Sequence, residues 1–261
     1  MKKSHFNIQR ETKALAHTGE MELFYREEIE DSIQNSYVYR ENVDSNTIKY
    51  DNITTKITVE PLTTTDAIIK YSNDKCASLN FASFKYPGGG FIRGSIAQEE
   101  TLCHDSFLYN VLSANKFKNM YADNRLKENQ NHGLYTNFGI YSPNILFEKK
   151  YTSFGAVIHK AKCNIITVAA PNLSVYPEGE NAEYKNTMYK RIKFVLDVAK
   201  KHNNDTLILG AFGCGVFKND PTFVSKVFKE LLNSGYYNFK KVIFAVPSGP
   251  NYTAFVKTFN E

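Results

Sequence analysis

Residues 206–232 read TLILGAFGCGVFKNDPTFVSKVFKELL and contain, in order, an apolar run, a glycine-rich segment and an amphipathic stretch. The apolar run predicts a buried strand over 206–210, and the amphipathic stretch predicts a helix over 221–233. Asp220 suits the N-cap of that helix, and Pro221 suits its first turn. A strand, a glycine loop and a helix in this order are typical of a sheet on which helices pack.

The same alternation continues on both sides of this stretch. Apolar segments predict strands at 155–159, 165–169 and 242–246, and the clearest amphipathic pattern predicts a helix over 181–202. A short helix is expected to close the chain. Apolar strands that alternate with amphipathic helices indicate an α/β fold with a mixed, mostly parallel sheet covered on both faces. Ligands of such sheets bind at the carboxyl ends of the strands, where the glycine loops fall.

The first half of the chain has weaker periodicity. Apolar residues spaced by three to four predict helices in the first 35 residues, and β-branched or apolar runs predict strands at 53–60 and 76–81. A helix is expected over 101–114. Residues 119–150 show few periodic signals, which predicts a long loop with no more than one short strand.

Composition excludes several classes of protein. The 261 residues are 42% hydrophobic and 23% charged, which argues against disorder, and no run of 18 apolar residues suggests a transmembrane helix. The net charge of +5 is compatible with an anionic ligand but weaker than a dedicated nucleic-acid binder needs. The basic N-terminus leads into polar residues, so secretion through a signal peptide is not expected.

Metal and disulfide chemistry are also disfavoured. The four cysteines, at 76, 103, 163 and 214, are too far apart for a CxxC metal clip, and no HExxH motif or pair of histidines four residues apart occurs. We therefore expect free thiols in a reducing cytoplasm, with neither a metal nor a cofactor.

The first candidate site reads PGGGFIRGSIAQEE over residues 87–100. Successive glycines allow close approach of the backbone to a ligand, and their N–H groups can form a nest for phosphate oxygens. Glu99 and Glu100 follow, and a carboxyl group in a pocket has a raised pKa and can exchange a proton with a leaving oxygen. The alternative is a tight turn followed by two acids that stabilise a helix N-terminus. Both interpretations stay open on spacing alone.

The second candidate site is the glycine-rich segment 210–221. Free N–H groups would suit a diphosphate there, and Phe217 could offer a flat face to a ribose or base; the expected donors are Gly213, Cys214, Gly215 and Val216. An ordinary connection between strand and helix is the alternative. A nucleophilic role for Cys214 is not supported, because no histidine is placed in sequence to activate it.

Several of these segments together resemble poly(ADP-ribose) glycohydrolases, in particular the compact microbial type built on a macrodomain. The similar segments are Asn80-Phe81-Ala82-Ser83, Pro87 to Gly90, Gln98-Glu99-Glu100, Tyr141-Ser142-Pro143, Ala169 to Asn172, and Gly210 to Asn219. The triple glycine followed by Gln-Glu-Glu is the most specific of them. The resemblance runs from about residue 10 to the C-terminus.

The resemblance implies a macrodomain-like single domain over residues 1–261, with a helical N-terminal extension over about 1–50. It implies ADP-ribose as the ligand. Glu100 would be the catalytic acid and base, and Glu99 would bind ribose hydroxyls. The ligand would be held by Asn80, Gly88, Gly89, Gly90, Gln98, Gly213, Cys214, Gly215, Val216 and Phe217. For adenine, an aromatic residue near the C-terminus such as Phe244 or Phe255 is the expectation.

The expected function is hydrolysis of ribose–ribose O-glycosidic bonds in poly(ADP-ribose) by a monomeric, non-membrane enzyme. Two alternatives stay open. One is a mono-ADP-ribosyl hydrolase that acts on modified protein or nucleic acid, because the acceptor lies outside the glycine loops. The other is a non-catalytic ADP-ribose reader, which the pair of glutamates argues against.

Overall fold

The computed structural model describes residues 5–41, 43, 54–151 and 157–260. Within these residues, seven strands form one sheet in the order β1-β4-β5-β3-β6-β7-β2. The strands are β1 Tyr37–Arg40, β2 Lys56–Glu60, β3 Cys76–Phe81, β4 Phe138–Tyr151, β5 Val157–Val168, β6 Thr206–Leu209 and β7 Lys241–Ala245.

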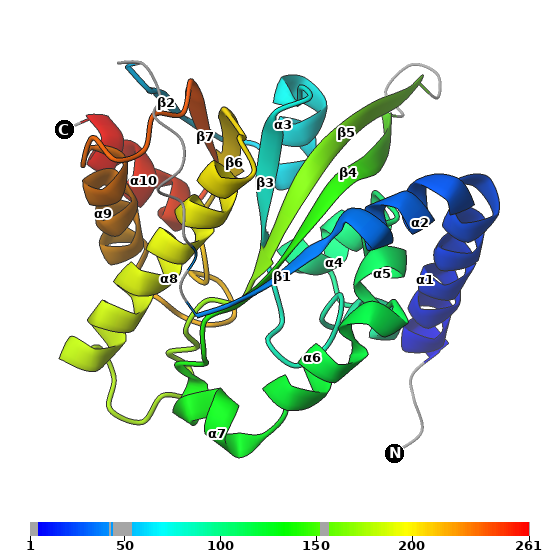
Figure 1. Ribbon diagram of the computed structural model, residues 1–261, viewed down its shortest axis with the longest axis horizontal. Coiled ribbons are helices and arrows are strands. Elements are labelled where there is room, and N and C mark those ends of the chain that lie inside the picture. Colours follow the sequence, from blue (N-terminus) through cyan, green and yellow to red (C-terminus); the bar gives the residue numbers. More distant parts are fainter. Residues whose placement is uncertain (1–4, 42, 44–53, 152–156, 261) are drawn as a thin grey trace.

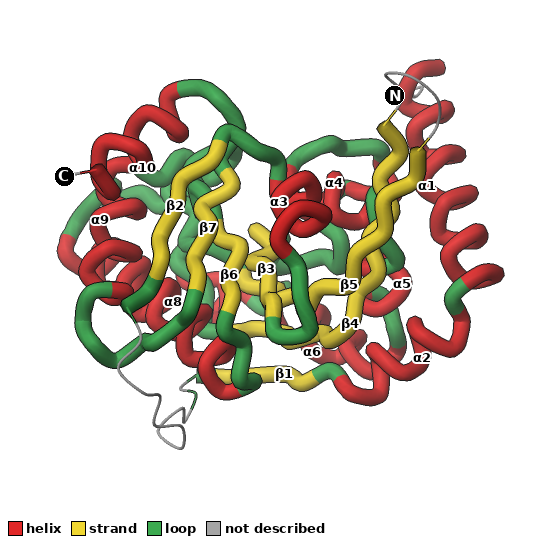
Figure 2. The backbone as a smooth tube through the Cα atoms, turned by 90° about the horizontal axis from the view of Figure 1, so that it is seen from above, coloured by secondary structure: helices red, strands yellow, loops and turns green. Residues whose placement is uncertain are grey.

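The sheet is mixed and mostly parallel. β5, β3, β6, β7 and β2 run parallel, whereas β4 pairs with β5, and β1 with β4, in the antiparallel sense. β3 and β6 are buried along nearly their whole length, as the apolar runs predict for central strands covered on both faces. Figure 2 shows the strands side by side, with helices around them.

Helices cover both faces of the sheet (Figure 1). Residues of α8, α9 and α10 share one core cluster with the sheet, and residues of α1 to α6 share the other. The helices are α1 His5–Phe24, α2 Arg26–Asn35, α3 Thr64–Tyr71, α4 Gln98–His104, α5 Leu108–Leu112, α6 Lys118–Asn124, α7 Lys127–Gln130, α8 Ala182–Lys201, α9 Pro221–Leu232 and α10 Pro250–Asn260. The predicted α/β class, with a mostly parallel sheet between helices, is confirmed.

Side-chain caps explain where three of these helices begin. The side chains of Thr63, Asn181 and Asp220 accept hydrogen bonds from backbone N–H groups in the first turns of α3, α8 and α9. Pro221 occupies the first turn of α9, where its missing N–H costs nothing. The start predicted for the helix after the second glycine loop is therefore correct.

The prediction for residues 119–150 was wrong. These residues contain most of α6, all of α7 and the long strand β4, not an extended loop. The alternating pattern that predicts a strand is interrupted in β4. The register with β5 shifts between Ser142 and Ile145, where Asn144 has a φ of +57°. Its partner β5 is one continuous strand over residues for which two short strands were expected.

Other boundaries also differ from expectation. The helix expected over 101–114 is broken into α4 and α5, because Ser106 leaves the helix to form a bridge with Phe147. The strand expected at 53–60 begins at Lys56, and residue 53 lies outside the described residues, as do 155 and 156. Strand β1 and helix α3 were not predicted; β1 lies in the segment expected to be a helical extension.

Candidate active site

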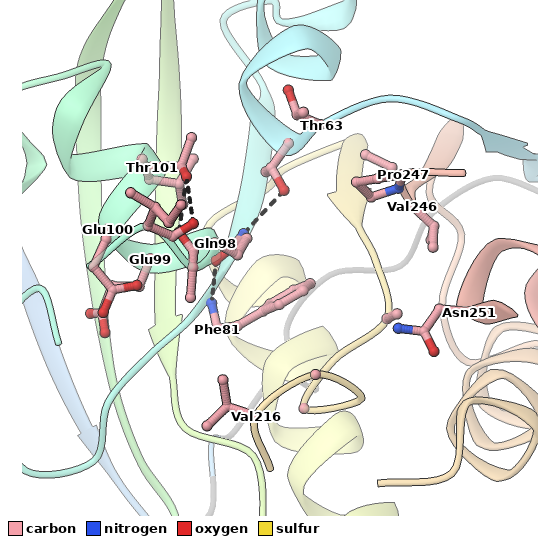
Figure 3. A pocket seen from close by; sticks show the side chains of 18 of the residues that line it. Thr63, Phe81, Gln98, Glu99, Glu100, Thr101, Val216, Val246, Pro247 and Asn251 are labelled. Atoms are coloured by element: carbon pink, nitrogen blue, oxygen red, sulfur yellow. Dashed lines mark hydrogen bonds between the residues drawn. The ribbon is translucent and has the colours of Figure 1, made fainter. Parts of the chain in front are cut away.

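A cavity of about 740 Å³ lies at the carboxyl ends of the parallel strands. Segments that follow all five of these strands line it, as expected for a doubly covered sheet. Its volume is in the range of pockets that hold small-molecule ligands. Figure 3 shows Glu99 and Glu100 at one end and Asn251 at the other, with Phe81 between them.

Gln98 fixes the start of α4 at the end of β3. Its Nε2 donates to the backbone oxygen of Leu79 at 2.9 Å and to Oγ1 of Thr64 at 3.1 Å. Its Oε1 accepts from the backbone N–H of Phe81 at 2.8 Å. Gln98 lines the cavity, but its amide is used in these protein contacts. It therefore positions the two glutamates that follow it.

The carboxyl group of Glu99 is held by the protein through both oxygens. Oε2 accepts from the backbone N–H of Ser83 at 2.6 Å, and Oε1 accepts from Nδ2 of Asn80 at 3.2 Å. Burial raises the pKa of Glu99 to about 8, and the charge of Glu100 adds to the rise. The hydrogen bonds from Ser83 and Asn80 oppose that rise without cancelling it. Glu99 is therefore mainly uncharged at pH 7.

Glu100 has a different environment. Its Oε1 accepts a hydrogen bond of 2.7 Å from the backbone N–H of Gly90. In the described part of the chain, no hydrogen bond reaches its Oε2. The residue is 8% exposed and lines the cavity. One oxygen of Glu100 is thus oriented by the protein, while the other is available to a ligand.

The triple glycine allows its turn to approach both glutamates. Gly89 has a φ of +59°, and a Cβ placed there would lie 2.6 Å from Oε1 of Glu100 and 2.9 Å from Oε2 of Glu99. Gly88 has a φ of +63°, and its Cβ would lie 2.7 Å from the ring of Tyr109. Any side chain at Gly89 would meet the carboxylates. Of the three glycines, Gly89 lines the cavity.

Asn80 lies beneath the cavity and not in its wall. It is fully buried, and its Nδ2 donates to Glu99 and, at 3.3 Å, to Oγ1 of Thr167. The expectation that it would hold the distal ribose is not matched by this placement. Asn80 contacts the carboxyl group of Glu99 instead.

The second glycine loop also lines the cavity. Gly213, Gly215, Val216 and Phe217 all belong to the lining. Backbone N–H groups of Gly215 and Val216 make no hydrogen bond within the described chain, which leaves them available to an anion. Cys214 differs from expectation, because its N–H donates to the oxygen of Ala211 at 3.1 Å and it lies outside the lining.

Asn219 holds this loop and was missed in the sequence. Its Nδ2 donates to the backbone oxygens of Pro171 at 2.9 Å and Gly213 at 3.1 Å, and its Oδ1 accepts from the hydroxyl of Tyr184 at 2.9 Å. Gly213 has a φ of +72°, and a Cβ there would lie 2.6 Å from Cβ of Ala170. The loop is therefore tied to the end of β5 and to α8.

Arg191 on α8 is a second residue that the sequence did not reveal. It is 1% exposed, and its guanidinium donates to backbone oxygens of Ala169, Leu134 and Tyr135. Burial lowers the pKa of Arg191 to about 10, so it stays charged at pH 7. It joins the segment before β4 to the end of β5, and only its partners in space distinguish it from a surface arginine.

The prediction that Phe244 or Phe255 contacts adenine was wrong. Phe244 and Phe255 are fully buried in the core, where their rings lie 5.3 Å apart, and neither lines the cavity. The end of the cavity far from the glutamates is formed by residues 246–251. Val246, Pro247 and Asn251 are labelled at this end in Figure 3.

Two further observations concern the described residues only. No cluster of three or more potential metal-ligating His, Cys, Asp or Glu side chains occurs among them. No helix among them combines the length and the apolar character that crossing a membrane requires.

Comparison with known proteins identifies the family. The family model described as microbial-type PARG, catalytic domain, matches residues 5–150. A crystal structure of poly(ADP-ribose) glycohydrolase from Thermomonospora curvata is 28% identical with a TM-score of 0.82, covering 96% of this chain and 99% of that one. The same enzyme bound to the inhibitor ADP-HPD is 27% identical with a TM-score of 0.80, covering 95% and 98%.

A third solved structure agrees with these. The Deinococcus radiodurans poly(ADP-ribose) glycohydrolase in complex with ADP-ribose is 31% identical with a TM-score of 0.77, covering 88% of this chain and 96% of that one. No curated protein matches the sequence. With a family match over more than half of the chain and solved relatives over nearly all of it, the chain belongs to the microbial-type poly(ADP-ribose) glycohydrolases, a family of glycoside hydrolases.

Proposed function

We propose that Glu100 is the general acid and base with which this poly(ADP-ribose) glycohydrolase cleaves ribose–ribose O-glycosidic bonds and releases ADP-ribose. The observation that carries this assignment is the contrast between the two glutamates. Both oxygens of Glu99 accept hydrogen bonds from the protein, whereas Oε2 of Glu100 accepts none in the described chain. A catalytic acid needs an oxygen that can reach the leaving group.

The proposed reaction begins with proton transfer from Glu100 to the oxygen that links the two riboses. The bond between that oxygen and the anomeric carbon then breaks, and an oxocarbenium-like state forms. The nearby diphosphate of the substrate stabilises its positive charge, so a second catalytic carboxylate is not required. Water attacks the anomeric carbon and returns a proton to Glu100.

ADP-ribose fits the cavity in one orientation under this proposal. The distal ribose lies against Gly89 and the glutamates. Glu99, which lines the cavity, binds the ribose hydroxyls with the hydrogen-bonding capacity that Ser83 and Asn80 leave unused. The diphosphate lies against Gly215, Val216 and Phe217, whose loop carries free N–H groups. Because Glu99 is mainly neutral at pH 7, it adds little negative charge next to a dianion. Adenine then lies at the end formed by residues 246–251.

Glu100→Gln tests the assignment. The variant should lose at least about 100-fold in turnover of poly(ADP-ribose), the lower range for a general acid, while its Kd for ADP-ribose changes little. Hydrolysis at the wild-type rate would show that another group is the acid. Parallel assays on mono-ADP-ribosylated protein and on ADP-ribosylated DNA show whether the enzyme cleaves the polymer or single modifications. A purified protein that cleaves none of the three substrates would be a non-catalytic ADP-ribose reader.

The proposal also includes a monomeric state, a cytoplasmic site of action and a single domain. A cytoplasmic site of action is supported by four free cysteines, three of them buried, because such thiols suit a reducing compartment. The monomeric state stays a prediction. A single domain is supported by α1 and α2, whose Ala14, Met21 and Ile29 belong to the same core cluster as strand residues.

A further inference from the structure

Tyr86, Arg93 and Arg125 form an exposed cluster beside the catalytic turn. The guanidinium carbon of Arg93 lies 5.7 Å from the centre of the Tyr86 ring, and that of Arg125 lies 5.8 Å from it. Tyr86 is 45% exposed, and both arginines are exposed. Among the described residues, no ion pair joins a carboxylate to Arg93 or Arg125. The cluster therefore presents an aromatic ring and two uncompensated positive charges to solvent.

The backbone connects this cluster directly to the two glutamates. The backbone oxygen of Tyr86 accepts a hydrogen bond from the N–H of Gly89, and its own N–H donates to Oγ of Ser83. Ser83 in turn donates its N–H to Glu99. Arg125 is tied to the same segment, because its Nη1 donates to the backbone oxygen of Lys85 at 3.1 Å. The cluster is thus held in position relative to the reacting bond.

Tyr86, Arg93 and Arg125 do not line the cavity. Because the cavity extends from the glutamates toward residues 246–251, the bond to the leaving group begins at its glutamate end. The leaving part of a polymer therefore lies outside this cavity, and the cluster is joined by the Gly89–Tyr86 hydrogen bond to the turn that lines the glutamate end. That part starts with an adenosine and continues into a diphosphate.

We infer that Tyr86, Arg93 and Arg125 form a second binding subsite, which holds the ADP-ribose unit on the leaving side of the scissile bond. The inference rests on the proposed function. The ring of Tyr86 and the planar guanidinium groups stack on adenine, and the two positive charges bind the diphosphate. A cluster of this kind favours polymer over substrates whose leaving group is a protein side chain.

The test compares ADP-ribose with its dimer, two units joined by a ribose–ribose bond. The parent protein carries Glu100→Gln so that the dimer stays intact, and Kd is measured by calorimetry. We expect the parent to bind the dimer about tenfold more tightly than the monomer, since stacking one base has roughly that effect. Tyr86→Ala, or Arg93→Ala with Arg125→Ala, should remove this difference and leave the Kd for ADP-ribose unchanged.

A matched control and a salt series make the result specific. Arg26→Ala with Lys226→Ala removes two exposed positive charges on α2 and α9 and should keep the preference for the dimer. The double arginine variant should also weaken the salt dependence of dimer binding, because fewer phosphate contacts release fewer ions. Equal Kd values for monomer and dimer in the parent, or a preference that survives in both variants, would overturn the inference. Failure to bind ADP-ribose at all would instead contradict the proposed function.

A second test compares cleavage of poly(ADP-ribose) with cleavage of a mono-ADP-ribosylated protein. Under the inference, the arginine variant in the otherwise wild-type chain raises KM for poly(ADP-ribose) and leaves cleavage of a mono-ADP-ribosylated protein unchanged. An equal loss on both substrates would mean that the cluster does not recognise a nucleotide and would also overturn the inference.

Discussion

The backbone N–H of Gly90 donates a hydrogen bond of 2.7 Å to Oε1 of Glu100. This contact orients the carboxyl group while its other oxygen stays available. It is possible because the preceding residue has no side chain: a Cβ at Gly89 would lie within 3 Å of both carboxyl groups. The absence of a side chain at Gly89 is therefore needed for the position of Glu100, which is the acid under the proposed function.

Gly89→Ala should inactivate the enzyme, and its cost in stability should be close to that of placing any alanine in a left-handed backbone position. The added methyl group meets Glu100 at 2.6 Å and displaces it, and a small misplacement of a reacting group reduces kcat by about 100-fold. Gly179→Ala is the matched control, because Gly179 has a similar φ of +67° but nothing within 4 Å of its Cβ. Each variant should lose about 1–2 kcal/mol of stability from the left-handed backbone. Full activity of Gly89→Ala would refute the argument.

Glu99 should make the stability of the protein fall as the pH rises. Its pKa is about 8 in the folded state and 4.5 in the unfolded reference. Below pH 4.5 the carboxyl is neutral in both states, and between 4.5 and 8 only the unfolded state releases the proton, so folding becomes less favourable.

Glu99→Gln cannot ionise and should remove this loss. Its Tm relative to wild type should therefore increase between pH 5 and pH 8, by an amount on the order of several degrees. Scanning calorimetry of both proteins across that range measures the difference. A difference in Tm that is constant with pH would show that Glu99 is ionised in the folded protein.

Asn219→Ala should loosen the second glycine loop. The substitution leaves the backbone oxygens of Pro171 and Gly213 without their side-chain donor, at a cost of about 1–3 kcal/mol in the free energy of unfolding. Under the proposed function, Kd for ADP-ribose should rise as well. Tyr184→Phe is the control, because it removes only the hydrogen bond to Oδ1 of Asn219 and should affect binding less. Equal Kd values for the two variants would argue against this role.

Arg191→Met should be strongly destabilising. The change removes the donors to three buried backbone oxygens, and each buried oxygen left without a donor should cost about 1–3 kcal/mol in the free energy of unfolding. Lys190→Met at the neighbouring exposed position should change stability by no more than about 0.5 kcal/mol. Urea unfolding of the two variants compares them directly. Similar midpoints would mean that the buried guanidinium contributes little.

Local signals in the sequence were sufficient to predict several helices and strands in the second half of the chain. β6, α9, α8 and β7 lie within one or two residues of their predicted bounds, because apolar runs, amphipathic periodicity and caps are read along the chain. The family, the two glycine loops and the pair of glutamates were also recognisable from short motifs, and the family is confirmed.

Other elements depended on partners far away in the chain. β4 was read as loop because its alternation is interrupted at Pro143 and Asn144, and its pairing with β5 decides the strand. Phe244 and Phe255 looked suitable for adenine, but their position in the core comes from packing between α9, α10 and the sheet.

The reactive groups can be read from the amino-acid sequence: glycines whose backbone can take positive φ angles, and two adjacent carboxyl groups. Which of these carboxyl groups keeps an oxygen without a hydrogen bond depends on the folded structure. Ser83 and Asn80 take both oxygens of Glu99, while Gly90 takes one of Glu100. Adjacent residues in a helix point in different directions, so their partners come from separate segments, and hydrogen bonds between segments distant along the chain leave no periodic signal in the sequence.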